Sequence, residues 1–375
     1  MKKINVGIIG LGNCAASLIQ GIEYYRQTTH AHDGITKKDI GGYTFNDIDI
    51  KIAFDVDKRK VGKSIGDAIY SKPNCVFQFV SEVKNSNLVY SAPVLDGVSE
   101  HMLEYNADHS FRITDIAALT EEEIISLLIK NDIQILVNYL PVGSQIGTEF
   151  WANICLKTGI SFLNCIPVFI ASDPIWEQKF IDAKIPIIGD DMKSQFGASI
   201  VSQVLQELAF SRGHKVKCHI QQNFGGNTDF LNMTNKHRLI SKKISKENVI
   251  RSQNIIHNVP SDESFLFAGP SDYIEYYGDN KIAHFHLELE GFGGAPVILD
   301  AKLSVQDSPN SAGVVIDAIR YLIVAKEMGI VGALRGPSAF TQKSPPLQMA
   351  FKDAEYECDQ IAQRTYTSIT QKQIV

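Results

Sequence analysis

A short apolar segment that leads directly into a glycine-rich turn is the feature that most constrains this chain. Residues 4–9 are largely apolar, which predicts a strand buried on both faces of a parallel sheet. The turn that follows has Gly10, Gly12 and Ala15 at the spacing of a dinucleotide-binding loop, and a helix is expected from about Asn13. Because the loop joins a strand to a helix, we interpret it as a phosphate-binding turn rather than a plain one.

An acidic residue is expected about 20 residues beyond such a loop, where it would bind the adenine ribose. The candidate, Asp55, lies more than twice that far along, at the end of a strand predicted over residues 50–54. A polar insertion over residues 29–47 explains the delay. The Asp55 carboxylate would repel the 2′-phosphate of NADP and so favours NAD, although nearby Lys58 and Arg59 leave NADP open.

Strand and helix signals alternate through the first half of the chain. Further buried strands are predicted over residues 133–138, 160–164 and 185–188, and helices are expected from near Lys58, after the capping box Thr120–Glu123, and from Ser144 to near Gly159. This alternation is the doubly wound pattern of α/β proteins. From about Lys215 the signals change to strands over residues 219–222, 282–290 and 297–303, which predict an antiparallel region, and helical periodicity returns over residues 311–328.

We therefore expect an α/β fold in three parts. Residues 1–200 form a Rossmann-type doubly wound parallel sheet, and residues 201–305 form an inserted α+β region for catalysis and oligomerisation. Residues 306–375 return to the first domain.

Composition excludes several classes of function. The 375 residues carry a net charge of −6 without an extended basic stripe, so no nucleic-acid partner is expected. No apolar stretch approaches the roughly 18 residues of a membrane span, and the glycine-broken start does not fit a signal peptide. Six scattered cysteines lack metal-binding spacing, so we interpret them as reduced thiols in a cytoplasmic protein.

Four further patterns could carry chemistry. The acidic and basic residues of 189–194 follow a strand, where they could bind a cation, shuttle a proton, or simply complement a helix dipole. Lys242 and Lys246 share a face if their segment is helical, forming either a phosphate site or a solvated basic face. Residues 223–229 are rich in glycine and amides, and could be only a loop. The alternating pairs His284 with His286 and His30 with His32 are interpreted as structural and loop residues rather than as metal ligands.

Taken together, these segments resemble the myo-inositol-1-phosphate synthase family, in its shorter prokaryotic form, over nearly the whole chain. The resemblance is carried by residues 10–17, 54–57, 137–144, 189–194, 225–229, 241–246 and 307–312. It implies conversion of D-glucose 6-phosphate to 1D-myo-inositol 3-phosphate by oxidation at C5, enolisation, aldol closure onto C1 and reduction, with NAD regenerated in each turnover. It also implies a homotetramer.

The resemblance assigns site residues in this chain. The implied catalytic residues are Lys242, Lys246, Lys281, Lys343, Asp191, Asp229 and Asp307. The implied cofactor-binding residues are Gly10, Gly12, Asn13, Cys14, Ala15, Asp55, Asn138, Leu140, Pro141, Asp190, Lys193 and Ser194. The family's loop at residues 189–194 can also hold a cation near the nicotinamide, but no metal ligands are identified here.

The lysines can be divided by role. Lys242 and Lys281 are expected to transfer protons and stabilise oxyanions, and Lys246 and Lys343 to bind the phosphate and carbonyl oxygens. Asp307 would orient or neutralise a lysine. The alternative enzyme is a net NAD-dependent sugar-phosphate or homoserine-type dehydrogenase, and the alternative from another class is a non-catalytic NAD-binding regulator.

Overall fold

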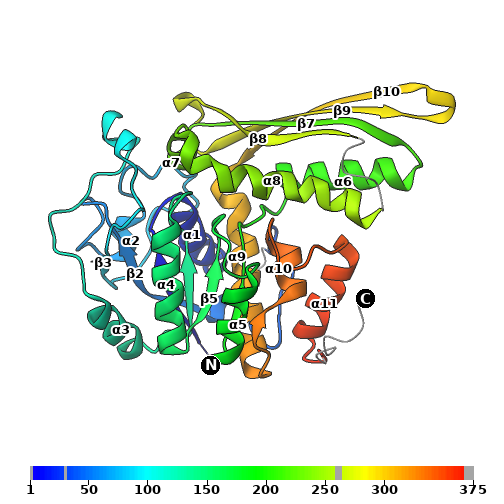
Figure 1. The fold of residues 1–375 in the computed structure, drawn as a ribbon. Helices are drawn as coiled ribbons and strands as arrows, with labels where there is room; N and C mark the ends of the chain where they lie inside the picture. The colour runs from blue at the N-terminus through cyan, green and yellow to red at the C-terminus, as the bar shows by residue number, and fades with distance from the viewer. Residues whose placement is uncertain (1–2, 29–31, 258–263, 367–375) are drawn as a thin grey trace.

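Two sheets with their helices make up the molecule, a computed structural model that describes residues 3–28, 32–257 and 264–366 (Figure 1). The side chains of residues 239–241 are also outside the description. His30, the first residues of the insertion and the end of the tail lie outside the described residues. None of the helices in the described part is long and apolar enough to span a membrane.

The first sheet is parallel and has seven strands in the order β3-β2-β1-β4-β5-β6-β11. Their bounds are β1 (Ile4–Ile9), β2 (Ile48–Asp55), β3 (Val89–Ser91), β4 (Ile135–Asn138), β5 (Ser161–Asn164), β6 (Pro186–Ile188) and β11 (Gly332–Ala333). The chain reverses direction across the sheet between β1 and β4, and an open α/β sheet binds its ligands at such a point. The predicted Rossmann-type fold class is therefore confirmed.

Helices cover both faces of this sheet. They are α1 (Asn13–Gln27), α2 (Ile65–Ala68), α3 (Glu121–Lys130), α4 (Gln145–Thr158), α5 (Pro174–Asp182), α9 (Asp307–Glu327), α10 (Arg335–Thr341) and α11 (Phe351–Ala362), with short 3₁₀ turns at Phe45–Asp47 and Glu100–Glu104. The predicted capping box is present at Thr120 and Glu123, and α4 ends at Gly159 in the left-handed conformation, as its sequence predicted.

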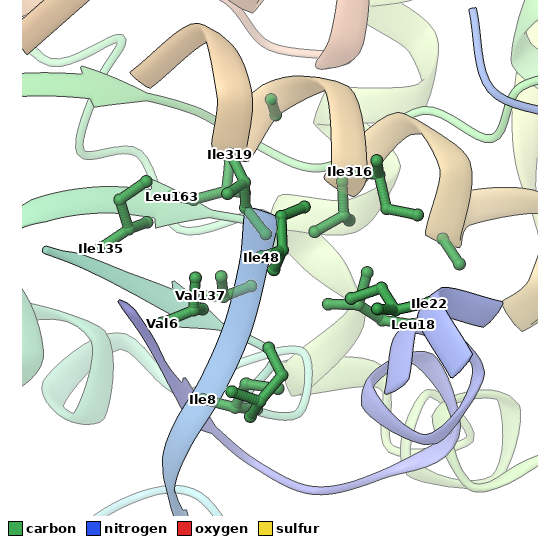
Figure 2. Packing of buried hydrophobic residues seen from close by; sticks show 14 of the residues in the cluster. Val6, Ile8, Leu18, Ile22, Ile48, Ile135, Val137, Leu163, Ile316 and Ile319 are labelled. Atoms are coloured by element: carbon green, nitrogen blue, oxygen red, sulfur yellow. The ribbon is translucent and has the colours of Figure 1, made fainter. Parts of the chain in front are cut away.

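The main core lies between the parallel sheet and the helices α1 and α9. Figure 2 shows strand side chains such as Val6 and Val137 facing Leu18 of α1 and Ile316 of α9. The opposite face of the sheet packs against α3, α4 and α5, where Trp151 and Phe162 are buried. Because these strands are buried on both faces, their sequences are nearly continuous runs of apolar residues.

The second sheet has the order β10-β9-β7-β8 and one covered face. Its strands are β7 (Lys215–Gly225), β8 (Phe265–Tyr273), β9 (Asn280–Glu290) and β10 (Pro296–Gln306), with α6 (Ala198–Ser211), α7 (Thr228–Asn232) and α8 (Lys236–Ile256) beside them and 3₁₀ turns at Glu275–Tyr277 and Phe292–Gly294. In Figure 1, α6 and α8 lie along this sheet on the side of the parallel domain.

Two sequence predictions are wrong. The second region was expected to be antiparallel, but β7 and β8 run parallel, so the sheet is mixed. The reason is that α8 connects these strands as a crossover, and β8 itself was not predicted. The helix expected from near Lys58 is absent. Turns occupy that segment, in which Lys60 donates to the Leu11 carbonyl of the glycine turn, and α2 is only four residues long.

The described part of the insertion packs against α9. Its apolar residues enter the main core, namely Ile35, Ile40, Tyr43 and Phe45. The buried Arg320 of α9 donates hydrogen bonds to the carbonyls of Lys37 and Lys38 and pairs with Asp317. The insertion thus ties the N-terminal region to the returning helix.

Candidate active site

A cavity of about 1290 Å³, part of it open to solvent, lies where the two sheets meet. Its lining comes from the start of α1, the segments after β4, β5 and β6, the elements from α6 to α8, the starts of β9 and α9, and the segment after α10. All seven residues expected to be catalytic line it, namely Lys242, Lys246, Lys281, Lys343, Asp191, Asp229 and Asp307. Of the expected cofactor-binding residues, Gly12, Asn13, Cys14, Leu140, Pro141 and Ser194 line it.

Asp191 is the centre of the charged cluster. Lys242 and Lys343 each place Nζ 3.0 Å from its Oδ1, and the Ser245 hydroxyl donates to its Oδ2 at 2.7 Å. Lys242 and Ser245 reach the same carboxylate because residues three apart share a helix face. Although burial opposes a charged carboxylate, the two ammonium groups hold the pKa of Asp191 below its usual range. Asp191 is therefore an anion, and its carboxylate contacts the side chains of Lys242, Ser245 and Lys343 rather than the amides of the helix that begins at Ala198.

The backbone around Asp191 is held rigidly. Its φ of 61° is unusual for a residue other than glycine. The Asp191 amide donates to the Ile166 carbonyl (3.1 Å), and its own carbonyl accepts from the Lys343 amide (2.7 Å). This pairing joins the segment that carries Asp191 to the segment that carries Lys343, so the two side chains meet although 152 residues separate them.

The other two lysines have different surroundings. Lys281, at the start of β9, forms an ion pair with Asp307, the first residue of α9. Lys246 is 8% exposed and, within the described residues, no carboxylate lies within 4.0 Å of its ammonium nitrogen. Burial, together with Lys242, Lys281 and Lys343, lowers the pKa of Lys246 well below its ordinary value. The solvated basic face considered for Lys242 and Lys246 is therefore wrong.

Lys193 and Asp190 lie behind the cavity and not on its lining. Lys193 Nζ donates to the Ala339 carbonyl at 2.7 Å, and burial lowers its pKa to about 7. The Asp190 carboxylate accepts from the Asn164 amide (2.7 Å) and from the amide and hydroxyl of Ser172 (3.0 and 2.8 Å), while burial raises its pKa to about 6. Both side chains fix the loop on which Asp191 stands.

The glycine turn opens α1 beside the cavity. Gly10 has φ +85°, and a Cβ there would lie 2.8 Å from the Tyr139 carbonyl oxygen, so the turn itself requires glycine. Gly12 is different, because a Cβ added there would meet nothing within 4 Å. Gly12 is also the N-cap of α1 and supplies no side-chain cap. Open space beside uncapped helix amides fits a bound pyrophosphate.

Asp55 and Lys60 stabilise this turn through hydrogen bonds to its backbone. Its Oδ2 accepts from the Leu11 amide at 2.8 Å, and its Oδ1 accepts from the amides of Val56 and Asp57. Lys60 donates to the Leu11 carbonyl at 2.8 Å. The Asp55 carboxylate is 9% exposed and does not line the cavity.

The remaining expected cofactor residues have supporting positions. Asn138 is buried and accepts a hydrogen bond from the Leu140 amide at 3.2 Å, which shapes the turn that carries Leu140 and Pro141 to the cavity. Ala15 is buried inside α1, where its small side chain allows close packing. His284 lies on the outer face of the second sheet beside His286, which pairs with Asp300.

The sequence interpretation missed Asp279. This buried carboxylate accepts from the Asn227 amide (3.0 Å) and from the hydroxyl of Ser308 (2.7 Å), next to the cavity. Burial and the neighbouring Asp307 raise its pKa to about 7. In the sequence, what could have indicated a role for Asp279 is that it lies two residues before Lys281, a residue expected to be catalytic. Among the described residues no group of three or more His, Cys, Asp or Glu side chains could hold a metal ion.

Comparisons with known proteins agree with one another. A family model described as myo-inositol-1-phosphate synthase matches residues 197–308. The inositol-3-phosphate synthase of Mycobacterium tuberculosis is 41% identical over 349 residues, 92% of each chain, and that of Corynebacterium glutamicum is 41% identical over 92% of this chain and 94% of the relative.

Solved structures share the fold. A myo-inositol-1-phosphate synthase-related protein from Thermotoga maritima has a TM-score of 0.79 and 23% identity, covering 96% of this chain and 98% of that chain. An inositol-3-phosphate synthase from Caenorhabditis elegans has a TM-score of 0.73 and 15% identity, covering 96% and 85%. At these identities the likeness concerns the fold.

Proposed function

This chain belongs to the inositol-3-phosphate synthase family, and from that premise we propose that it converts D-glucose 6-phosphate to 1D-myo-inositol 3-phosphate with bound NAD. The single observation that carries the proposal is that one cavity joins the glycine turn to four lysines, two of them buried and two largely buried. A regulator that only binds NAD has no need for buried lysines, because burying an ammonium group costs free energy.

NAD fits the residues present. Gly12, Asn13 and Cys14 line the cavity at the amino end of α1, where backbone amides favour an anion. The amides of this turn would hold the pyrophosphate of the cofactor, and Ser194, which also lines the cavity, would contact its nicotinamide part. A nicotinamide cofactor held by these residues would supply reversible hydride transfer at C5 of the sugar.

The lysines would stabilise the negative charge that the substrate brings and that the reaction develops. Asp191 and Asp229 raise the pKa of Lys242 against the effect of burial, so Lys242 stays an ammonium ion. As a persistent ammonium ion it is suited to stabilise an enolate or alkoxide oxygen, whereas its raised pKa makes it a weak acid for the proton transfer expected of it. Lys281 is oriented for the same task by Asp307.

Lys246 and Lys343 would bind the phosphate and the carbonyl oxygens. Burial lowers the pKa of Lys343 to about 8, and Lys246 is shifted further. A bound phosphate dianion would supply the counter-charge that Lys246 lacks and would favour the ammonium form of both lysines. We also propose that a cation binds beside the nicotinamide, and we assign no protein ligands to it.

We also propose a cytoplasmic homotetramer built on the second sheet. On β10 every second side chain is exposed, while Leu299, Ala301 and Leu303 are partly buried on the opposite face. Exposed apolar residues at this end of the sheet include Val297 and Ile298 of β10 and Phe292 of the preceding 3₁₀ turn. Such a row suits an interface between copies. None of the six cysteines forms a disulfide, which suits a reducing compartment.

The deciding experiment distinguishes the synthase from a net dehydrogenase. Glucose 6-phosphate deuterated at C5 is incubated with a small amount of NAD, and the product is analysed by mass spectrometry while NADH absorbance is followed. We expect inositol phosphate well in excess of the NAD supplied, with the deuterium retained and no steady NADH. Accumulation of NADH in proportion to sugar consumed, with loss of the label, would establish the dehydrogenase instead.

A further inference from the structure

The covered face of β7 carries polar side chains where a strand under helices normally carries apolar ones. His219, Gln221 and Asn223 alternate along it, and all three are buried. The neighbouring strand β9 turns apolar residues to the same helices, namely Ala283, Phe285 and Leu287. Buried polar groups cost free energy unless they are hydrogen-bonded, so the difference between the strands calls for a function.

The polar side chains form one continuous hydrogen-bonded chain. Asn223 Nδ2 donates to the Gly269 carbonyl (2.7 Å), and Gln221 Nε2 donates to Asn223 Oδ1 (3.0 Å). The Ser202 hydroxyl of α6 donates to Gln221 Oε1 (2.7 Å). Since its one proton is used there, the Ser202 oxygen accepts from His219 Nε2 at 3.1 Å. The fixed carbonyl of Gly269 thereby sets the orientation of each amide in turn.

The far end of the chain is anchored in the core of the second region. His219 Nδ1 and Gln206 Oε1 lie 2.6 Å apart, and Gln206 Nε2 and Asn254 Oδ1 of α8 are also 2.6 Å apart. Because a neutral ring that donates from Nε2 can only accept at Nδ1, the Gln206 amide must be turned so that its NH₂ group donates to the ring and its oxygen accepts from the Asn254 amide. Burial lowers the pKa of His219 to about 4, so the ring is neutral near pH 7. His219, Gln206 and Asn254 are each at most 1% exposed. The chain is therefore a rigid support and not a surface network.

The near end of the chain reaches the active-site cavity, which Gln221 and Asn223 line. In the hydrogen bonds of the described residues, each of these NH₂ groups uses one N–H and leaves the other for a ligand. An amide in the opposite orientation would offer its carbonyl oxygen there. Donors suit a sugar phosphate, whose hydroxyl and phosphate oxygens all accept hydrogen bonds.

We propose that Ser202 and His219 are positioning residues, which hold the Gln221 and Asn223 amides so that their free N–H groups bind substrate oxygens and read the configuration of the sugar. The inference rests on the proposed function, because that function supplies the sugar phosphate. It assigns a role to buried residues on α6 and β7 that do not touch substrate.

Ser202→Ala tests the proposal by freeing the Gln221 amide to rotate. We expect KM for glucose 6-phosphate to rise about tenfold, the scale of one buried hydrogen bond, with a smaller change in kcat and unchanged NAD affinity. Discrimination against mannose 6-phosphate, which differs in the configuration of one hydroxyl, should fall at least several-fold. Ser202→Thr keeps the hydroxyl and should restore both values, and His219→Leu should reproduce the defect.

Ser252→Ala is the matched control, because among the described residues that buried hydroxyl donates only to the Val249 carbonyl of its own helix. Unchanged KM and discrimination in folded Ser202→Ala, or an equal change in the control, would overturn the inference. Wild-type protein that forms no inositol phosphate would instead refute the proposed function, so the two failures are separate.

Discussion

At the residue scale, the four lysines of the cavity differ in their carboxylate partners. Lys242 and Lys343 share Asp191, Lys281 has Asp307, and Lys246 has no carboxylate partner among the described residues. Spacing alone could not show this, since the two carboxylates come from distant segments. The arrangement leaves one amine available for charge that arrives with the substrate.

Removing any one of these ammonium groups should impair catalysis strongly. Alanine at Lys242, Lys246, Lys281 or Lys343 should each cost at least about 3 kcal/mol of transition-state stabilisation, the scale of one well-placed donor in a dry site. The measurement is kcat/KM for glucose 6-phosphate. Lys243→Ala is the control, because Lys243 is exposed beside Phe267, and near wild-type rates in all five variants would contradict the assignment.

Substrate affinity should depend on pH through Lys343. Burial depresses its pKa to about 8, so the ammonium form predominates below that value and is lost above it. We expect kcat/KM to fall as the pH rises from 7 to 9, because the neutral amine attracts the phosphate less. In Lys343→Arg the charge persists and the fall over this range should be shallower; an identical profile would remove Lys343 from phosphate binding.

At the element scale, the turn between β1 and α1 separates folding from cofactor binding. Gly10 is required by its positive φ and by the nearby Tyr139 carbonyl, whereas Gly12 leaves open space. The two glycines of one motif thus have different physical tasks.

The two glycines should respond differently to substitution. Gly12→Val should abolish NAD binding while leaving the thermal unfolding midpoint close to that of the wild type, because the new side chain fills only the space of the pyrophosphate. Gly10→Ala should lower the midpoint, since its Cβ would lie 2.8 Å from the Tyr139 oxygen. Calorimetric titration with NAD and thermal unfolding measure both effects, and tight binding by Gly12→Val would refute the loop assignment.

At the scale of the whole molecule, the open face of the second sheet should hold the assembly together. Ile298→Glu would bury a charge in the proposed interface and should dissociate the tetramer, as followed by light scattering. Ile129→Glu on α3 is matched in exposure, 65% against 63%, and should leave the assembly intact. A wild-type monomer, or a tetramer unaffected by Ile298→Glu, would exclude this interface.

The sequence by itself determined the Rossmann-type domain, because its signals are local. A strand buried on both faces must be apolar, a turn at Gly10 must be glycine, and a helix after Thr120 needs its cap. The family resemblance supplied the seven candidate catalytic residues, which the structure brings to one cavity.

Only the tertiary structure decided the interactions between distant segments. Asp191 meets Lys343 because backbone hydrogen bonds join their two segments, and four apolar residues of the polar insertion enter the main core because α9 returns to cover them. The parallel pairing of β7 with β8 and the buried chain from His219 to Asn223 also depend on contacts across the fold. Such contacts produce no periodic pattern of residues along the sequence. The free energy that stabilises them comes from residues far away in the chain, and the order of the sequence does not show which residues those are.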